Sequence, residues 1–530
     1  MDKEVWQTAR RYSPQKLELA RKVLEQIRAG SEVSEALRRH PLPDGGYLGK
    51  NILVAAYRDL TQNGIWPEDP ALLARIRLKP IRTLSGVTTV TVLTKPYPCP
   101  AKCIFCPTED NMPKSYIADE PGARRAVEHN FDPFDQVASR MEALTSVGHP
   151  TDKIELLILG GTWSAYRRDY QEWFIRRCFD ALNEVESESL DIAFQRNETA
   201  PHRNVGLVIE TRPDEITPAE IRWLRQLGVT KVQMGAQSFD NEILALNRRG
   251  HTVEQTLTAV ALLRSAGFKI VLHWMPNLLG ATPESDRRDF QRMWQDFCPD
   301  EIKIYPNQLL EHTELYRIWQ EGGYQPYTTE ELVNLIADIK PSIPRYCRVN
   351  RVIRDIPSTY VIDGNKVTSL RQDVHQELRR RGTRCNCIRC REIGHRHLDH
   401  HSLHPEDIIY QAAYAEEHFL SYVTSDDRLA GFLRLSLPAD NAPDVGIDEI
   451  RGAAMIREVH VYGQSLEVGR DQPGAAQHIG LGTQLLHWAE QIAIQRHFSH
   501  LAVISAIGTR QYYLKRGFTR GKFYMLKHLD

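Results

Sequence analysis

The sequence has almost no net charge, few cysteines and no long apolar run. Its 67 Lys and Arg against 68 Asp and Glu leave a formal net charge of −1, so any nucleic-acid surface must come from local patches. No segment approaches the roughly 18 apolar residues of a membrane span, and Met1 to Trp6 contain no apolar signal core. With 42% hydrophobic residues among 530, we expect two to four globular domains, no membrane partner and a cytoplasmic location.

Six of the nine cysteines are concentrated in two places. The six clustered cysteines are Cys99, Cys103 and Cys106, and then Cys385, Cys387 and Cys390. Tight clusters of this kind are typical of metal binding in a reducing compartment and argue against a disulfide framework.

The first cluster has CxxxCxxC spacing and follows a β-type run, Val87–Leu93. Three thiolates on one loop can ligate three irons of a [4Fe–4S] cluster and leave the fourth iron open for another ligand. A zinc knuckle is the alternative, but zinc sites usually draw two separated pairs of ligands, and no second pair lies nearby. We therefore assign Cys99, Cys103 and Cys106 to an iron–sulfur cluster.

From residue 76 to 370, strands and helices alternate, which predicts a parallel sheet. Six strand-like runs suit an open (β/α)6 barrel, in which functional residues gather at the carboxyl ends of the strands. These runs are Val87–Leu93, Ile154–Leu159, Val205–Thr211, Lys231–Gly235, Lys269–Met275 and Glu301–Tyr305. The candidates at or near their ends are Gly160, Gly161, Thr162, Glu210, Gln233 and Gln237. A glycine pair lets a backbone approach a ligand closely, but a structural role is the alternative for each polar side chain.

Residues 1–75 read as helical. Ser13-Pro14 is a typical helix start, apolar residues then repeat at helical spacing, and Gly30 ends the run. Residues 1–82 hold 15 Lys and Arg against 10 Asp and Glu, a surplus of five positive charges. That surplus would serve contacts with nucleic-acid phosphates, or it is an ordinary solvated helical surface.

Residues 371–404 form a basic linker around the second cysteine cluster. Its arginines are Arg371, Arg379, Arg380, Arg381, Arg384, Arg389, Arg391 and Arg396. The histidines after the cysteines are His395, His397, His400, His401 and His404. A Cys3His zinc site is chemically natural for such a set, but the sequence does not select the histidine. Free thiols beside a solvated histidine run are the alternative.

Residues 405–530 change in character. The expected strands are His418–Thr424, Leu429–Leu437, Met455–Tyr462 and His500–Ala506, and the last two flank a helix at Gly482–Ile494. Before this helix lies a Q-x-x-G-x-G element: Gln477, His478, Ile479, Gly480, Leu481, Gly482 and Thr483. Glycines at a helix start free backbone N–H groups to hold a pyrophosphate.

The elements follow in the order strand, Q-x-x-G-x-G element, helix and strand, and then come Tyr512 and Tyr513. This arrangement resembles that of the GCN5-related N-acetyltransferases, which bind acetyl-CoA. The resemblance implies that Tyr513, with Tyr512 beside it, approaches the CoA sulfur and acts as an acid. Tyr513 as a plain core residue is the alternative. The backbone of Val459–Val461, including His460, would polarise the thioester carbonyl. Residues 463–476 separate strand and glycines more widely than is usual in that family.

The CxxxCxxC loop resembles that of the radical S-adenosylmethionine (SAM) enzymes. The resemblance implies that the open iron chelates SAM and passes it an electron, which releases a 5′-deoxyadenosyl radical. It also implies that Gly160 and Gly161, followed by Thr162, meet the SAM amino group. Glu210 would bond the ribose, and Gln233 or Gln237 would also face SAM.

The two halves together resemble the catalytic subunit of Elongator (Elongator protein three) in its stand-alone microbial form. The segments that carry the resemblance are Lys79–Gly86, Gly160–Thr162, Ile209–Asp214, Asn247–Thr252, Lys303–Pro306, Arg354–Pro357, Arg457–Gly463 and Tyr512-Tyr513. The resemblance implies an α/β multidomain chain. Its parts are a helical tRNA-binding region (1–75), a partial (β/α)6 radical SAM barrel (76–370), a zinc-binding linker (371–404) and a GCN5-type acetyltransferase domain (405–530).

The resemblance also implies a reaction, the 5-carboxymethylation of the wobble uridine (position 34) of tRNA. A SAM-derived radical and acetyl-CoA would act in one cleft shared by the two domains, on a uridine splayed from the anticodon loop. No obligate protein partner is implied, and a homodimer and the electron donor stay open. The competing hypotheses are a protein lysine acetyltransferase with a structural cluster and a tRNA-binding scaffold without turnover.

Overall fold

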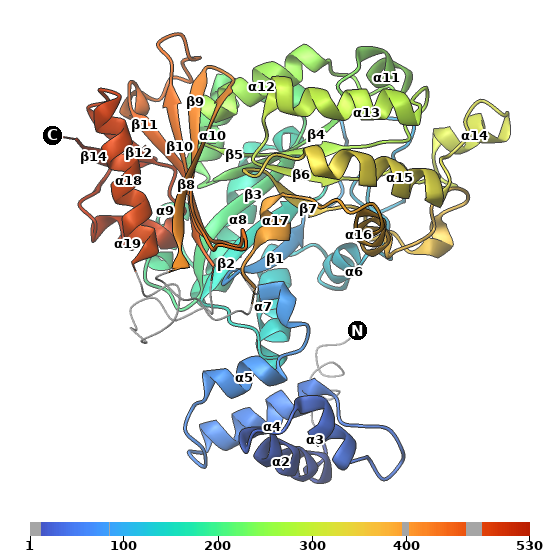
Figure 1. Cartoon of the computed structure of the whole chain (residues 1–530), viewed down its shortest axis with the longest axis vertical. Helices are drawn as coiled ribbons and strands as arrows, with labels where there is room; N and C mark the ends of the chain where they lie inside the picture. Colours follow the sequence, from blue (N-terminus) through green and yellow to red (C-terminus); the bar gives the residue numbers. More distant parts are fainter. Residues whose placement is uncertain (1–11, 84, 395–401, 463–479, 530) are drawn as a thin grey trace.

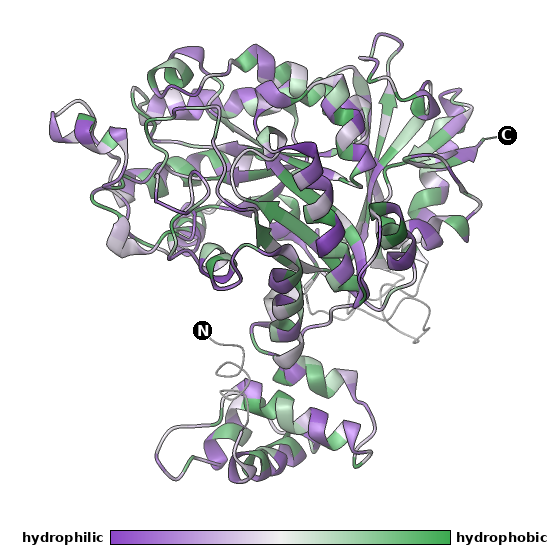
Figure 2. Cartoon of the chain, turned by 180° about the vertical axis from the view of Figure 1, so that it is seen from behind, coloured by the Kyte–Doolittle hydropathy of each residue, from purple (hydrophilic) through white to green (hydrophobic). Residues whose placement is uncertain are grey.

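Two seven-stranded sheets lie side by side, and a small helical lobe projects from one end of the molecule (Figure 1). The computed structural model describes residues 12–83, 85–394, 402–462 and 480–529. One apolar core runs through both sheets, and Figure 2 shows apolar residues gathered on the central strands. Within the described ranges, no helix combines the length and apolar character that a bilayer crossing needs.

The first sheet is a half-barrel of parallel strands that follow one another in sequence order. Strands β1 to β7 are Thr88–Leu93, Lys153–Leu159, Arg203–Thr211, Lys231–Gln237, Lys269–Trp274, Glu301–Ile304 and Arg348–Arg351. The sequence predicts the first six and misses β7, because Arg-Val-Asn-Arg lacks the apolar run of a buried strand. The half-barrel therefore has one strand more than the predicted six.

Helices cover the outer face of the half-barrel (Figure 1). Helices α6 to α13 are Pro121–Glu128, Pro133–Ser146, Arg168–Asn183, Leu190–Asn197, Pro218–Gln226, Asn241–Leu246, Val253–Ser265 and Pro283–Arg292. Helices α14 to α17 are Glu314–Gln320, Thr329–Ile339, Leu370–Arg380 and Ile388–Arg391. Several begin at a threonine, such as Thr217, Thr252 and Thr282, whose side chain accepts a backbone N–H of the first turn. Such caps satisfy donors that the helix itself leaves unpaired.

The second sheet is mixed, with the order β13-β14-β12-β11-β10-β9-β8 and one parallel pair, β11 with β12. Strands β8 to β14 are His404–Ala412, Ala415–Val423, Leu429–Pro438, Ala454–Val461, His500–Val503, Thr519–Arg520 and Met525–His528. The four predicted runs correspond to β9 to β12, and the predicted helix is confirmed as α18 (Leu481–Gln495). The polar edge strand β8 and the short strands β13 and β14 are not predicted. A short helix, α19 (Arg510–Leu514), follows β12.

The N-terminal lobe has an apolar core of its own. Its helices α2 to α5 are Pro14–Arg28, Val33–Arg39, Lys50–Gln62 and Pro70–Ile76. The predicted start of the first helix is confirmed, because the Ser13 hydroxyl accepts the N–H of Lys16. Arg77 Nε, just after the lobe, donates to Gly148 O over 2.7 Å and so ties the lobe to the half-barrel.

One buried carboxylate on α13 makes stability depend on pH. Burial raises the pKa of Asp286 to about 7, and its carboxylate accepts from the Asn277 N–H and the Tyr327 hydroxyl. Because the folded pKa lies above the unfolded one, this group favours unfolding as pH rises from about 4 to about 7. Between these pH values, the group costs up to about 4 kcal/mol of unfolding free energy. We expect Asp286→Asn to remove this pH dependence. Urea unfolding at pH 5 and pH 8 tests this. The exposed Asp448→Asn is the control, and an unchanged pH slope in Asp286→Asn would contradict it.

Candidate active site

One large cavity connects the two sheets. It has a volume of about 1030 Å³ and is the space into which most sequence-predicted site residues point. Its half-barrel wall includes Cys99, Cys103, Cys106, Gly161, Thr162, Glu210, Gln233 and Gln237. Its second-sheet wall includes Val459, His460, Val461, Gly480, Gly482, Thr483, Tyr512 and Tyr513. The expected shared cleft is therefore present, although the sequence places its two walls more than 200 residues apart.

The cysteine loop follows β1, and two arginines lie beside it. Arg249 Nη1 donates to Cys103 Sγ over 3.3 Å, and Arg212 Nη1 donates to the carbonyl of Arg249 over 3.0 Å. The hydrogen bond from Cys106, together with Arg249, lowers the pKa of Cys103 to about 5. Thiolate ligands need such deprotonation, so the loop fits an iron–sulfur cluster. Neither arginine was predicted as a site residue from the sequence.

The glycine pair brings backbone close to that loop. Gly160 and Gly161 have φ values of 128° and 100°, which favour glycine. A Cβ atom at Gly160 would collide with the Thr94 side chain. The next residue, Thr162, lies with its hydroxyl 3.6 Å from Cys99 Sγ. The turn after β2 therefore stands directly beside the cysteine loop.

The three polar candidates on β3 and β4 differ in whether their side-chain oxygens already have hydrogen-bond partners. Glu210 accepts a long hydrogen bond from Tyr116, 3.4 Å. Gln233 is already occupied, because its side-chain oxygen accepts from Lys303 Nζ and lies 3.1 Å from His273 Nε2. Gln237 Oε1 is buried and has no hydrogen-bond partner among the described residues. Gln237 is therefore better placed than Gln233 to bind a ligand.

At the second-sheet end of the cavity, β11 presents His460 and Glu458. Burial lowers the pKa of His460 to about 4, so the ring is neutral at pH 7. Its Nε2 has no hydrogen-bond partner among the described residues. Glu458 instead accepts from Lys269 Nζ at 2.8 Å and Arg434 Nε at 2.9 Å. Burial opposes ionisation of Glu458, but these cations hold its pKa far below the usual value. Glu458 is therefore no general base.

The start of α18 and the two tyrosines form the far wall. Gly480, with φ 73°, precedes α18, and a Cβ at Gly482 would lie 2.6 Å from the Tyr512 hydroxyl. Arg516 Nη2 donates to Thr483 Oγ1 over 3.0 Å, and the Arg516 guanidinium lies 3.6 Å from the Tyr512 ring centre.

Tyr513 packs edge-on between Tyr512 and Phe518, at 5.2 and 5.6 Å between ring centres. Burial raises the Tyr513 pKa, so its hydroxyl keeps its proton. Leu481 is buried in α18. Gln477, His478 and Ile479 lie outside the described residues.

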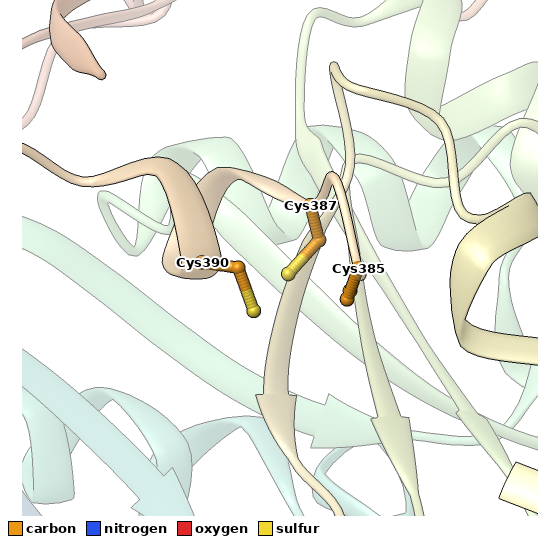
Figure 3. Close-up of side chains that lie close together, drawn as sticks. All are labelled: Cys385, Cys387 and Cys390. Carbon is orange, nitrogen blue, oxygen red and sulfur yellow. The ribbon is translucent and has the colours of Figure 1, made fainter. Parts of the chain in front are cut away.

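The linker cysteines form a compact thiol cluster (Figure 3). The Sγ atoms of Cys385, Cys387 and Cys390 all lie within 4.8 Å of one another. Hydrogen bonds from the other two thiols, and then the Lys340 charge, hold the pKa of Cys387 well below its usual value. Lys340 Nζ is buried without a hydrogen-bond partner among the described residues. A negatively charged metal–thiolate group would pair with this ammonium, so the donor set fits a zinc ion.

The structure describes only some of the histidines that the sequence suggests as a fourth zinc ligand. His395, His397, His400 and His401 lie outside the described residues, and His404 is exposed at the start of β8. His375 on α16 is a further histidine that was not predicted from the sequence. Burial and neighbouring cations lower its pKa to about 4, and the Cys387 thiolate acts on it in the opposite direction. The imidazole is therefore neutral, and its nitrogens do not belong to the group of ligand atoms within 4.8 Å of one another at the three thiols.

Several linker arginines serve the fold. Arg371 donates to two carbonyls of β7, and Arg391, only 3% exposed, pairs with Asp427. Arg381 pairs with Asp338 and Glu377. These three arginines therefore have hydrogen-bond or ion-pair partners within the protein.

Comparisons with known proteins agree with this geometry. The chain matches the Radical SAM superfamily over residues 97–292 and the Radical_SAM C-terminal domain over residues 299–380. The tRNA uridine(34) acetyltransferase of Dehalococcoides mccartyi is 44% identical, covering 85% of this chain and 99% of that protein. Elongator complex protein 3 of Schizosaccharomyces pombe is 36% identical, covering 87% of this chain and 88% of that protein.

A solved structure also matches, that of the archaeal Methanocaldococcus infernus Elp3 with an N-terminus deletion (1-46). It is 40% identical, has a TM-score of 0.74, and the match covers 84% of this chain and 100% of that one. Identity of this extent over nearly the whole length of each relative leaves no other family to consider. The chain belongs to the Elongator protein 3 family, and its half-barrel is a radical SAM domain.

Proposed function

We propose that this chain modifies uridine 34 of tRNA and attaches a carboxymethyl group to C5. The observation that carries the proposal is the single cavity lined by the cysteine loop at one end and by α18 and α19 at the other. Relatives of high coverage are named tRNA uridine(34) acetyltransferase. In the overall change, the C5–H of uridine becomes C5–CH2–COO⁻, and the acetyl group of acetyl-CoA supplies both carbons.

At the half-barrel end, Cys99, Cys103 and Cys106 would hold a [4Fe–4S] cluster. With SAM bound, that cluster supplies the radical that removes a hydrogen atom from the acetyl methyl group. Gly161 lines the cavity, and the backbone of Gly160 and Gly161 would meet the SAM amino group. Glu210 and Gln237 face the cavity and would bond the rest of SAM.

At the other end we propose a GCN5-type acetyl-CoA site. The N-terminus of α18 at Gly480 would receive the pyrophosphate, aided by Arg516. The backbone of Val459–Val461 would face the thioester carbonyl, and Tyr512 and Tyr513 would lie near the CoA sulfur. The neutral His460 ring lines the cavity beside this backbone, and its Nε2, which has no partner among the described residues, would hydrogen-bond a ligand there.

We propose that basic residues of the cavity wall contact the anticodon loop while its uridine enters the cavity. Basic residues in the wall include Arg125, Arg140, Lys153, Arg203, Arg351 and Arg389. Phosphate contacts from such side chains give affinity, and the unstacked base gives selectivity. We propose that the helical lobe at residues 12–76 adds further phosphate contacts.

An anaerobic assay tests this function. Reconstituted protein receives SAM, acetyl-CoA, reductant and unmodified tRNA, and the RNA is digested to nucleosides for mass analysis. We expect 5-carboxymethyluridine at position 34, with one deoxyadenosine released per turnover. Acetylated lysine without deoxyadenosine would contradict the proposal and favour a protein acetyltransferase. Tight tRNA binding without any product would favour a scaffold.

We propose that Cys385, Cys387 and Cys390 hold a structural zinc ion, with one of the histidines that follow them in the sequence as fourth donor. Replacing Cys387 with serine should reduce bound zinc from about one per chain to near zero, because a structural site needs all its ligands. The thermal midpoint should fall by several degrees. Metal analysis after dialysis measures the first effect and calorimetry the second. Cys103→Ser is the control and should keep its zinc, and full zinc in Cys387→Ser would sink the assignment.

A further inference from the structure

A buried carboxylate of the half-barrel reaches across the boundary to the helix that carries the two tyrosines. Glu198 follows α9 and is 2% exposed. It accepts from Gln511 Nε2 at 3.0 Å and from Arg510 Nη1 at 3.4 Å. A third donor is Arg520 on β13. All three donors belong to the second sheet or its helix, so Glu198 acts only between the two halves of the chain.

Close backbone packing supports the same contact. The turn at Ile507–Thr509 packs directly against β3. A Cβ atom at Gly508 would lie 2.6 to 2.9 Å from atoms of Arg203 and Asn204, so no larger residue fits. The Asn204 N–H donates to Asn197 Oδ1 over 2.8 Å at the end of α9. The start of β3, the end of α9 and the start of α19 therefore form one rigid junction.

This junction joins the two ends of the cavity. Strand β3 runs from Arg203 at the junction to Glu210 near the cysteine loop, about 23 Å at the usual rise per residue. Helix α19 continues from the junction to Tyr512 and Tyr513. Any shift of α19 on β3 therefore changes the distance between the two ends, and a misplacement of about 1 Å can slow a reaction considerably.

We propose that Glu198 is a positioning residue of the reaction. By holding Arg510 and Gln511, it fixes how far the acetyl group reaches toward the hydrogen-abstracting end. Glu198 is not among the residues that line the cavity, so it would act through α19. This inference rests on the proposed function, because it assigns Glu198 a part in aligning acetyl-CoA with SAM.

A matched control lies on the same boundary. Arg222 on α10 donates to the carbonyl of Val445 over 2.9 Å, so it also links the two halves. It contacts a loop before β11 and does not contact α19. A general loosening of the boundary would appear in Arg222→Ala, whereas a loss of alignment would appear only at Glu198.

The experiment compares the wild type with Glu198→Ala, Glu198→Gln and Arg222→Ala. We expect Glu198→Ala to slow uridine modification at least tenfold and to raise deoxyadenosine released per modified uridine at least fivefold. The Kd for acetyl-CoA should change less than threefold. Glu198→Gln, which still accepts from Gln511, should lie between Glu198→Ala and the wild type. Arg222→Ala should keep the wild-type ratio.

Hydrogen exchange of the amides in residues 507–514 gives a readout without turnover. It should quicken in Glu198→Ala and not in Arg222→Ala. Unchanged exchange, or an equal loss of deoxyadenosine and modified uridine in Glu198→Ala, would overturn the positioning role. If the wild type itself forms no modified uridine, the proposed function fails, and the exchange data alone decide whether Glu198 holds α19.

Discussion

Replacement of Cys103 by serine is expected to abolish both SAM cleavage and uridine modification, a loss on the order of 1000-fold or more. Cys103 is buried and lines the cavity, and its sulfur accepts a hydrogen bond from Arg249. A serine hydroxyl is a far weaker ligand than a thiolate, so the cluster should be lost. The measurements are the iron content, deoxyadenosine release and nucleoside analysis of the tRNA.

Acetyl-CoA binding should survive this change, because the residues proposed to hold CoA lie on α18 and α19 at the other end of the cavity. Cys298→Ser is the matched control. Its buried thiol donates to the carbonyl of Trp294, belongs to neither cluster and can be replaced by a hydroxyl donor. If Cys103→Ser still modified uridine, the radical route would be wrong.

The fold was predictable where local pattern and burial agree. Strands such as β2 and β5 are rich in apolar residues and flanked by turns, so the sequence alone predicts them. Strand β7 is four residues with two arginines, and it is a strand because it pairs in parallel with the neighbouring strand β6. Strand β8 is an edge strand in which only Ala412 is buried, and its sequence shows no apolar alternation that would predict it.

The site was predictable to the extent that its ligands are close in sequence. The CxxxCxxC spacing alone indicates the cluster, since all three ligands lie on one loop. Arg249 reaches Cys103 from 146 residues away, and Glu198 reaches Arg510 from 312 residues away. Such contacts depend on how the strands and helices pack. The same holds for Gln233, whose engagement with Lys303 appears only when β4 and β6 are placed together.

A second large effect is expected on stability, from Arg457→Met at the boundary between the sheets. Arg457 on β11 donates to both carboxylate oxygens of Asp300 at 2.7 and 2.6 Å and to Glu417 at 2.8 Å. All three side chains are 0% exposed. Burial opposes ionisation of Asp300, but Arg457 and Arg434 hold its pKa well below the usual value. Without Arg457, two carboxylates remain buried with too little positive charge.

Leaving buried charges uncompensated costs about 3–5 kcal/mol of unfolding free energy. Urea titration at pH 7 measures it as a shift of midpoint at constant slope. Arg451→Met is the control, because Arg451 pairs with Asp444 and Asp448 at the surface, where such pairs contribute about 0–1 kcal/mol. Adding Asp300→Asn to Arg457→Met removes one unpaired buried carboxylate and should restore part of the lost unfolding free energy. Equal effects of Arg457→Met and Arg451→Met would mean that the network contributes no more than a surface pair, and that apolar packing alone holds the two sheets together.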